Sequence, residues 1–348
     1  MQLVPVVSKT GKPLMPCHPA RARDLVRRGK AVRRFNKGLF YILLTEREDG
    51  ATQPVAVGVD PGSKREAFTV KSAEHTFENI QTEAIGWVKD AVETRRNMRR
   101  ARRFRKTPYR EMRANRAVRA GRIPPSTRAR WGLKLRLINW LASVYPITDV
   151  VVEDIAATTK PGKRRWNKSF SPLEVGKKWF YGEVAKRFTL TTKQGYATKT
   201  ERDRLGLFKS SAKLSTRWDA HCVDSWTLAN MAVGGHDGPD YVDMVLVVPL
   251  QFHRRQLHAL QPAAGNVRRT YGSTRSMGFK RGTWVSHPKF GASYVGGTMD
   301  GRVSLHSIET GKRLTQSAKP KDVKMLCLSS WRLSRTKGIV RGANGSSN

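Results

Sequence analysis

The stretch Val55–Lys64, V-A-V-G-V-D-P-G-S-K, decides how the rest of this chain is interpreted. Five uncharged residues rich in Val predict a strand, and Pro61 and Gly62 predict a turn directly after Asp60. The Asp60 carboxylate is therefore expected at the carboxyl end of a strand, where open α/β sheets place their functional groups. An aspartate in this position is often only a turn residue, so its interpretation depends on the rest of the chain.

Two later stretches carry acids in matching positions. The sequence V-V-V-E-D at 150–154 is a second β-branched run and ends in an acid, Glu153. The sequence W-D-A-H-C-V-D-S-W at 218–226 predicts a helix that carries His221 and Asp224. Mg²⁺ requires hard oxygen ligands, and a two-metal site holds its ions roughly 3.5–4 Å apart. The three stretches together predict a two-metal phosphodiesterase.

The charge of the chain limits the possible substrates. It has 66 Lys and Arg against 27 Asp and Glu in 348 residues, a formal net charge of +39. A compact protein with this charge repels itself unless it binds a polyanion, and phosphate backbones are the natural partner. A membrane surface is the weaker alternative because no amphipathic anchor or lipidation motif is visible. Hydrophobic residues make up 39% of the chain, which is enough for a buried core in two or three domains.

The sequence also indicates the compartment. No apolar run reaches membrane-spanning length, and the start M-Q-L-V-P-V-V lacks the features of a signal peptide. The three cysteines, Cys17, Cys222 and Cys327, are too widely spaced to support a disulfide framework or a zinc cluster. We therefore expect a protein of the reducing cytoplasm.

Residues 1–54 predict a small β-α-β-β domain. We expect a strand at Gln2–Val7, a turn at 9–16, a helix at Pro19–Arg28 and a hairpin over 31–44 that turns at Asn36-Lys37-Gly38. Its many arginines with a single nearby acid, Asp24, favour nucleic-acid contact over a merely solvated face. The polar residues 46–53 predict a linker.

A strongly basic segment follows the first motif. After a strand at Ala67–Lys71 and a helix at Ile80–Thr94, residues 95–122 hold thirteen Lys or Arg and one acid, Glu111. The segment has no continuous apolar stripe, so an RNA-bound helix is favoured over a disordered basic arm. The arginines predicted to bind nucleic acid are Arg95, Arg96, Arg99, Arg100, Arg102, Arg103, Arg105, Arg110, Arg113 and Arg116.

The remaining chain divides into two regions that differ in sequence pattern. Residues 131–250 predict a helix at Trp131–Val144, a strand at Ile147–Glu153, a helix at Leu173–Phe188 and a strand at Val242–Leu250. From 251 onward, short strand-like runs such as 283–286, 292–295 and 303–308 alternate with glycines, which suggests a small curved β-barrel. The last residues, 341–348, are expected to be disordered.

The motif order carries a family resemblance. Three motifs in this order resemble the split RuvC domain of transposon-encoded RNA-guided nucleases: G-V-D-P-G-S, V-V-V-E-D and D-A-H-C-V-D-S. As in that domain, an arginine-rich helix follows the first motif. G-K-P-L-M-P-C-H-P-A-R-A-R at 11–23 resembles the PLMP domain of the IscB and IsrB families, relatives of the type II CRISPR effectors. T-K-T-E-R-D-R-L-G-L at 198–207 and the Gly-rich end extend the resemblance over the whole chain. It implies an α/β, RNase H-like (RuvC) core.

An absence favours IsrB over IscB. IscB proteins carry an HNH nuclease between the second and third RuvC motifs, but residues 154–220 contain no histidine or cysteine and leave little room for such a domain. The resemblance implies domains at 1–54 (PLMP), 55–94 (the first RuvC segment), 95–130 (bridge helix), 131–250 (the second and third RuvC segments) and 251–348 (a wedge-like β-barrel that meets a flanking DNA motif).

By the same resemblance, Asp60, Glu153 and Asp224 fall on metal-ligand positions and His221 on a catalytic histidine. Two Mg²⁺ ions, for which Mn²⁺ can substitute, would activate water and stabilise the leaving 3′ oxygen, giving 5′-phosphate and 3′-hydroxyl ends. His221 would act as a general base or orient the water. Asp219 is expected to be a helix N-terminal residue and not a ligand.

The implied partners are a noncoding guide RNA and double-stranded target DNA that forms an R-loop, with no membrane partner. The implied enzyme nicks the displaced strand, as a monomer in a ribonucleoprotein, in the cytoplasm of a prokaryote and at its nucleoid when bound to DNA. Three alternatives stay open: a Holliday-junction resolvase, which would lack the arginine-rich insertion; a noncatalytic RNA-binding protein, which leaves the acids unexplained; and an actin-like or sugar-kinase ATPase, in which the basic helix has no role.

Overall fold

The computed structural model describes residues 2–104, 123–157, 171–251, 275 and 277–338, without the side chains of 102–104. The chain divides into two compact units. The first unit comprises Met1–Ile85, Thr127–Val247 and Leu333–Asn348, and the second comprises Gly86–Ser126 and Val248–Arg332. The predicted helix through 105–122 and the predicted disordered end at 341–348 lie outside the described residues.

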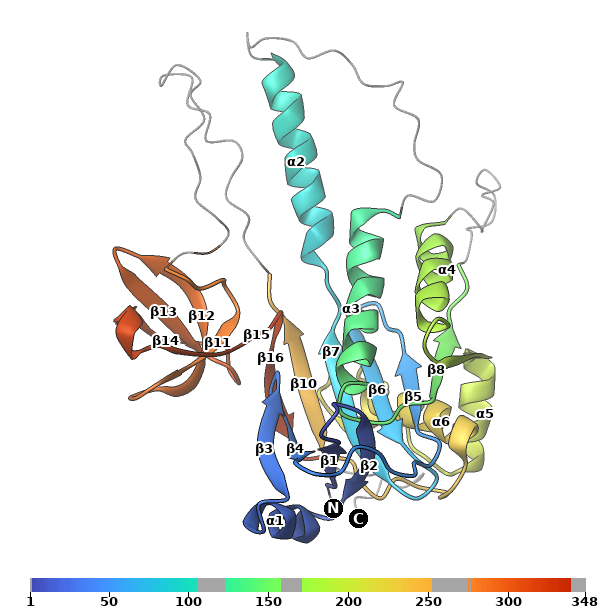
Figure 1. Cartoon of the computed structure of the whole chain (residues 1–348). Coiled ribbons are helices and arrows are strands. Elements are labelled where there is room, and N and C mark those ends of the chain that lie inside the picture. The colour runs from blue at the N-terminus through green and yellow to red at the C-terminus, as the bar shows by residue number, and fades with distance from the viewer. Residues whose placement is uncertain (1, 105–122, 158–170, 252–274, 276, 339–348) are drawn as a thin grey trace, which may run out of the picture. The chain divides into compact units, whose positions relative to one another are not determined.

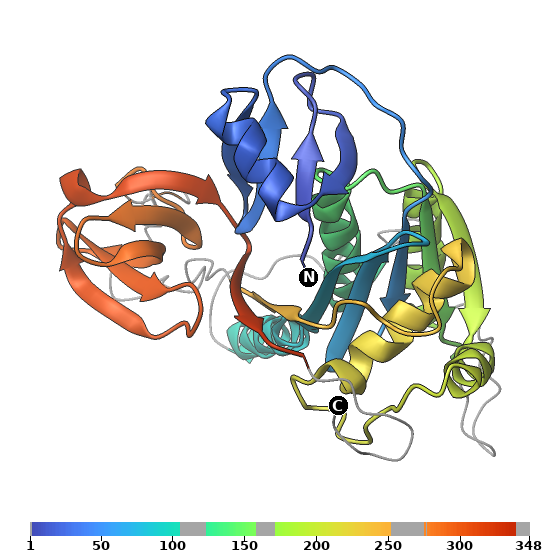
Figure 2. The ribbon, with the colours of Figure 1, turned by 90° about the horizontal axis from the view of Figure 1, so that it is seen from below.

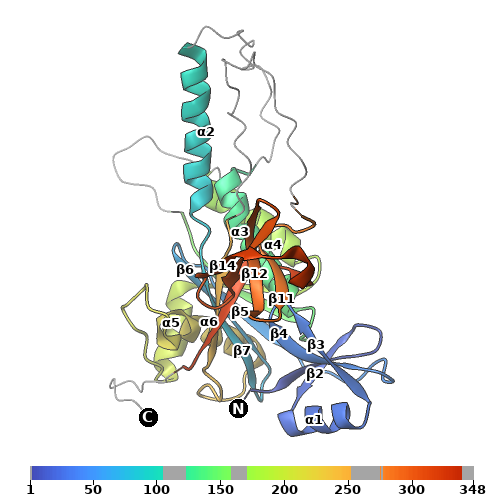
Figure 3. The same cartoon turned by 90° about the vertical axis from the view of Figure 1, so that its left-hand side faces the viewer.

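The N-terminal region of the first unit is a four-stranded sheet with one helix. Its strand order is β2-β1-β4-β3, and α1 lies along one face (Figure 3). The elements are β1 (Val4–Val7), β2 (Pro13–Cys17), α1 (Pro19–Arg27), β3 (Ala31–Asn36) and β4 (Leu39–Leu44). Val6, Ala22 and Ile42 belong to its buried core.

Two sequence predictions for this region have opposite outcomes. The hairpin is confirmed: Lys37 and Gly38 form the two-residue turn, both with positive φ, which matches the twist of the flanking strands. The predicted turn at 9–16 is wrong from Pro13 onward, because β2 pairs there with β1. An edge strand tolerates prolines at its ends and bulges, which the sequence interpretation overlooked.

The centre of the first unit is a seven-stranded mixed sheet of order β16-β10-β7-β6-β5-β8-β9 (Figure 1). The strand β5 pairs antiparallel with β6 and parallel with β8. The strands are β5 (Ala56–Asp60), β6 (Arg65–Lys71), β7 (Thr76–Glu83), β8 (Asp149–Asp154), β9 (Thr189–Gln194), β10 (Met244–Pro249) and β16 (Trp331–Thr336). The expected mixed α/β architecture is therefore confirmed.

Helices cover both faces of this sheet (Figure 2). On β6, Thr69 contacts Ser225 of α6, whereas Glu66 contacts Lys134 of α3, as the period of two in a strand requires. The helices are α3 (Pro125–Leu141), α4 (Pro172–Val184), α5 (Gly195–Arg204) and α6 (Trp218–Val233). Among the described helices, none is long and apolar enough to cross a membrane.

The sequence interpretation misses several elements here. The predicted helix at Ile80–Thr94 is wrong at its start, since Ile80 lies in β7 and the helix α2 begins at Trp87. The strand β9 and helix α5 were not predicted. β7 is buried on both faces and carries polar side chains within the core, so it shows no alternation of apolar and polar residues.

The second unit contains α2 (Trp87–Phe104) and a five-stranded antiparallel sheet of order β14-β13-β12-β11-β15. The predicted runs become β11 (Thr283–His287), β12 (Gly291–Met299) and β13 (Arg302–Ser307), joined by β14 (Arg313–Ala318) and β15 (Lys324–Leu328). Val285, Val295 and Leu305 belong to its core. In the described pairing β14 and β15 are edge strands; the barrel and its wedge role stay predictions.

A buried ion pair holds α3 to the central sheet. Lys134 Nζ lies 2.6 Å from Glu66 Oε1, with side-chain exposures of 4% and 0%. Burial raises the pKa of Glu66, and the Lys134 charge opposes that shift. Lys134 also lies 4.6 Å from the centre of the Trp131 ring.

We predict that Lys134→Ala destabilises the first unit by about 3–5 kcal/mol, because it leaves the Glu66 charge buried without a partner. The double variant Lys134→Met, Glu66→Leu removes both charges and should recover most of that loss. Urea unfolding followed by tryptophan fluorescence measures both effects. Equal losses in the single and the double variant would contradict this account of the pair.

Candidate active site

The sheet brings two of the predicted acids together at the carboxyl ends of neighbouring strands. The parallel pairing of β5 with β8 sets Val59 opposite Val152, so Asp60 and Glu153 follow at adjacent strand ends. Gly58 contacts α6, and the period of two places Asp60 on the same face of the sheet. By the same register Glu153 shares this face. Asp154 points to the other side, where it pairs with Lys177 and Tyr181 of α4.

The third acid comes from α6, which packs against the backbone of β5. A Cβ atom at Gly58 would lie 1.8 Å from the carbonyl oxygen of Ser225, so only glycine permits this approach. Ser225 directly follows Asp224. The close contact therefore carries the Asp224 carboxylate to the ends of the two strands.

The structure brings the three predicted ligands together. Asp60, Glu153 and Asp224 each offer a carboxylate oxygen, and these atoms lie within 4.8 Å of one another. Burial and the charges of Asp60 and Asp224 raise the pKa of Glu153 to about 7. Three clustered carboxylates of this kind are the donor set that Mg²⁺ or Mn²⁺ prefers. The residues therefore fit a divalent metal site.

The predicted histidine lies beside the cluster, one helical turn before Asp224. His221 Nδ1 is 3.1 Å from Asp60 Oδ2, and Nε2 is 2.9 Å from the carbonyl oxygen of Lys213. Burial lowers the His221 pKa, but the hydrogen bonds to Asp60 and to the carbonyl outweigh it, so the pKa is raised. Both contacts are satisfied together only by the imidazolium ring, which donates from each nitrogen.

Two cations that the sequence interpretation missed neutralise Asp224. Arg202 of α5 donates from Nη1 to Asp224 Oδ1 at 2.7 Å, and Lys209 Nζ pairs with Asp224 Oδ2. Arg202 is almost buried, whereas the Lys209 side chain is 38% exposed. The stretch at 198–207 contributes to the family resemblance, but only the fold shows that its Arg202 turns back onto the third motif.

Two further positions refine the site. Gly195, at the start of α5, lies so close to Glu153 that a Cβ atom there would be 2.8 Å from Glu153 Oε1. Asp219 is buried in the first turn of α6 and pairs with Arg217, so it lies outside the carboxylate cluster, as expected.

The predicted nucleic-acid-binding arginines are only partly described. Arg95, Arg96, Arg99 and Arg100 lie on α2 and have exposed side chains. Arg102 and Arg103 lie in α2 without described side chains, and Arg105, Arg110, Arg113 and Arg116 lie outside the described residues. The helix and the exposure at its described end agree with the sequence prediction, and the binding role stays a prediction.

Comparisons with known proteins add one family. Residues 4–165 match the model of the RRXRR protein family. The matched range includes the N-terminal sheet, Asp60 and Glu153 and ends before α6. No protein of curated function matches the chain.

Solved structures that match include T. thermophilus RuvC in complex with a Holliday junction substrate. The identity is 12% and the TM-score 0.28, and the match covers 52% of this chain and 97% of that chain.

We predict that Mn²⁺ raises the thermal unfolding midpoint of the protein, because binding to the folded state alone stabilises it, by about 2.7 kcal/mol at a hundredfold excess over the dissociation constant. Glu153→Gln should lose this response. Asp154→Asn, one residue along and on the other face, should keep it. Calorimetric titration with Mn²⁺ provides a second readout, and an equal response in both variants would contradict the assignment.

Proposed function

We propose that this protein is an RNA-guided DNA endonuclease that nicks the displaced strand of an R-loop. The observation that carries the proposal is the cluster of Asp60, Glu153 and Asp224 on one face and at one edge of the central sheet. The strand order β7-β6-β5-β8-β9, with β6 antiparallel to its neighbours, supports an RNase H-like core for it. The net charge of +39 supports a nucleic-acid substrate.

The three carboxylates would hold two Mg²⁺ ions, which when bound supply an activated water and stabilise the leaving oxygen. Arg202 keeps the Asp224 carboxylate oriented, and its burial limits the movement of that side chain. Lys209 is exposed enough to leave Asp224 and contact the incoming phosphate. His221 holds Asp60 in position, and its imidazolium ring can supply a proton beside that carboxylate.

The role of a guide RNA in the proposal rests on the basic segment and on the resemblance to IsrB. In this proposal 1–54 is the PLMP domain, 55–94 and 131–250 form the RuvC domain, 95–130 is the bridge helix and 251–348 forms the wedge and flanking-motif region. The residues that match the RRXRR family model, 4–165, include the N-terminal sheet and two of the three acids of the proposed site. Base pairing with the guide would supply the sequence specificity.

Strand choice follows from the geometry of an R-loop. One carboxylate cluster holds one scissile phosphate at a time, and the target strand is protected in the RNA–DNA heteroduplex. The displaced strand is unpaired and is therefore free to reach the carboxylate cluster. With no HNH stretch in the sequence, we propose that the target strand is left intact.

We predict that Asp60→Ala abolishes cleavage but leaves binding of RNA and matched DNA within about twofold, because it removes a metal ligand and leaves the basic surface unchanged. Cleavage of a labelled target and gel-shift binding are measured on the same ribonucleoprotein. An RNA-free arm with a four-way junction tests the resolvase alternative. Loss of DNA binding on the scale of the loss of cleavage would argue against the assignment of Asp60.

The arginines of α2 provide an independent test. We predict that replacing Arg96, Arg99 and Arg100 by Ala weakens RNA binding and lowers its log–log salt slope by about 0.7–0.9 for each phosphate that is no longer neutralised. The matched triple replacement by Lys keeps the charge and should keep most of the slope. An unchanged salt slope in the Ala variant would show that these arginines face solvent and do not contact RNA phosphates.

A further inference from the structure

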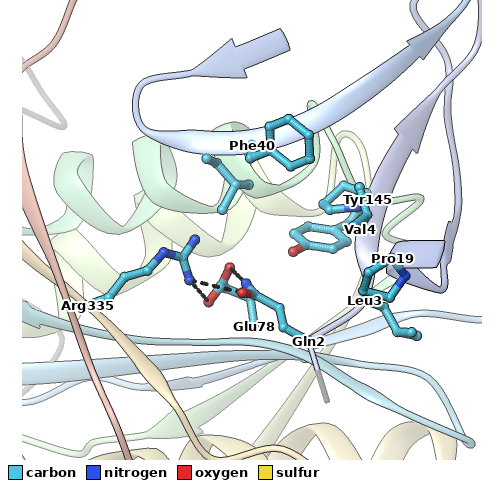
Figure 4. A pocket seen from close by; sticks show the side chains of 10 residues that line it. Gln2, Leu3, Val4, Pro19, Phe40, Glu78, Tyr145 and Arg335 are labelled. Carbon is cyan, nitrogen blue, oxygen red and sulfur yellow. Dashed lines mark hydrogen bonds and ion pairs between the residues drawn. The ribbon is translucent and has the colours of Figure 1, made fainter. Parts of the chain in front are cut away.

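A second site lies on the opposite face of the central sheet from the carboxylate cluster. In β7, Asn79 contacts Thr69 on the α6 side, so the preceding residue, Glu78, points to the other side. There a cavity of about 200 Å³ lies between the N-terminal sheet and the seven-stranded sheet, within the first unit (Figure 4). The nuclease mechanism does not use it.

The cavity combines apolar walls with a polar floor. Its walls include residues 2–5, Pro19 and Phe40, and its floor is formed by Glu78 and Tyr145. Arg335, whose side chain is 48% exposed, lines the same cavity. The volume is below the roughly 300–1,000 Å³ of pockets for drug-sized ligands, so it suits a single flat ring system.

Two polar atoms of the floor have no hydrogen-bond partner among the described residues. They are Glu78 Oε1 and the Tyr145 hydroxyl, and both side chains are fully buried. Glu78 Oε2 accepts from Gln2 Nε2 at 3.1 Å, and Arg335 Nη1 lies 3.6 Å from Oε1. Figure 4 shows the Tyr145 hydroxyl directed toward Glu78. Buried groups without hydrogen bonds are costly to folding, so a ligand that supplies the missing partners gains binding free energy here.

We propose that this cavity binds one unpaired guanine base of a bound nucleic acid. The guanine Watson–Crick edge offers two adjacent N–H donors, N1 and N2, for the Glu78 carboxylate, and an acceptor, O6, for the Tyr145 hydroxyl. Adenine and cytosine offer one amino group there and uracil one ring N–H, so each donates one hydrogen bond to the Glu78 carboxylate where guanine donates two. Phe40 and the prolines supply an apolar surround for a base turned out of its stack.

The charges around the cavity fit the same ligand. Arg335 can contact the phosphate of the inserted nucleotide, and the exposed arginines of α1, which begins at Pro19, can contact its neighbours. The inference rests on the proposed function only in taking a nucleic acid as the partner. It does not depend on cleavage.

The test uses short labelled uridine-rich RNAs with one central guanosine, inosine or adenosine, in salt high enough to weaken non-specific binding. Inosine lacks only the N2 amino group. We expect the protein to prefer guanosine over inosine by about tenfold. Glu78→Gln should abolish this preference, and Tyr145→Phe should weaken guanosine binding. Glu83→Gln, on the same strand but half-exposed, should change neither.

DNA oligonucleotides with the same single guanine show whether the guanine that binds belongs to RNA or to DNA. A preference in RNA alone assigns the pocket to RNA, and one in both assigns it to the base wherever it occurs. Thermal unfolding shows whether Glu78→Gln folds. If it does not fold, the guanosine binding of Tyr145→Phe, which removes a single oxygen, tests the proposal instead.

Equal binding of guanosine and inosine by the unaltered protein would overturn the proposal, as would a preference retained in folded Glu78→Gln. Cleavage is scored separately with Asp60→Ala. A nuclease without base preference refutes the pocket alone, and a base preference without cleavage refutes only the nuclease.

Discussion

The rest of the site depends on the contact between α6 and the backbone of β5 at Gly58. A side chain at this position would collide with the helix backbone, so the glycine sets how near α6 can lie. Asp224 precedes the contacting residue Ser225 and is carried to the end of β5. Two strands and one helix can thus bring three acids from distant stretches of the sequence within 4.8 Å.

The same cluster would repel itself without compensation. Burial, together with the charges of Asp60 and Asp224, raises the pKa of Glu153. Arg202 of α5 and Lys209, which follows that helix, neutralise Asp224. Sites that hold divalent cations cluster carboxylates in this way because the bound ions supply the positive charge that offsets their repulsion. The fold accepts local electrostatic cost at this cluster, whereas the buried charge of Glu66 elsewhere in the unit is paired with Lys134.

Much of this site is predictable from sequence because its acids stand at recognisable places. Asp60 and Glu153 end uncharged β-branched runs, and His221 and Asp224 share one helix face at a spacing of three. Arg202 and Lys209 could not be assigned, since their roles arise only when α5 turns back onto α6. Gly58 did carry a signal, because a glycine inside a strand often marks a close backbone approach.

The less predictable elements are those that break the rules of amphipathic patterning. β7 is buried on both faces and keeps Glu78, Asn79 and Gln81 in the core, so its sequence resembles neither a surface strand nor an apolar one. Asn79 is satisfied by Thr69 and a backbone carbonyl, whereas one oxygen of Glu78, which faces the cavity, accepts no hydrogen bond from the described residues. Such partners come from distant segments, which a local pattern does not reveal.

The most direct test of the central claim is cleavage of a supercoiled plasmid that carries the target of the guide RNA, with Mg²⁺ present. The account predicts conversion to the open-circular form, dependent on Asp60, with the break in the displaced strand. A linear product whose two ends both depend on Asp60 would contradict the nickase assignment. A plasmid that stays supercoiled, although the ribonucleoprotein is bound at its target, would contradict the nuclease itself.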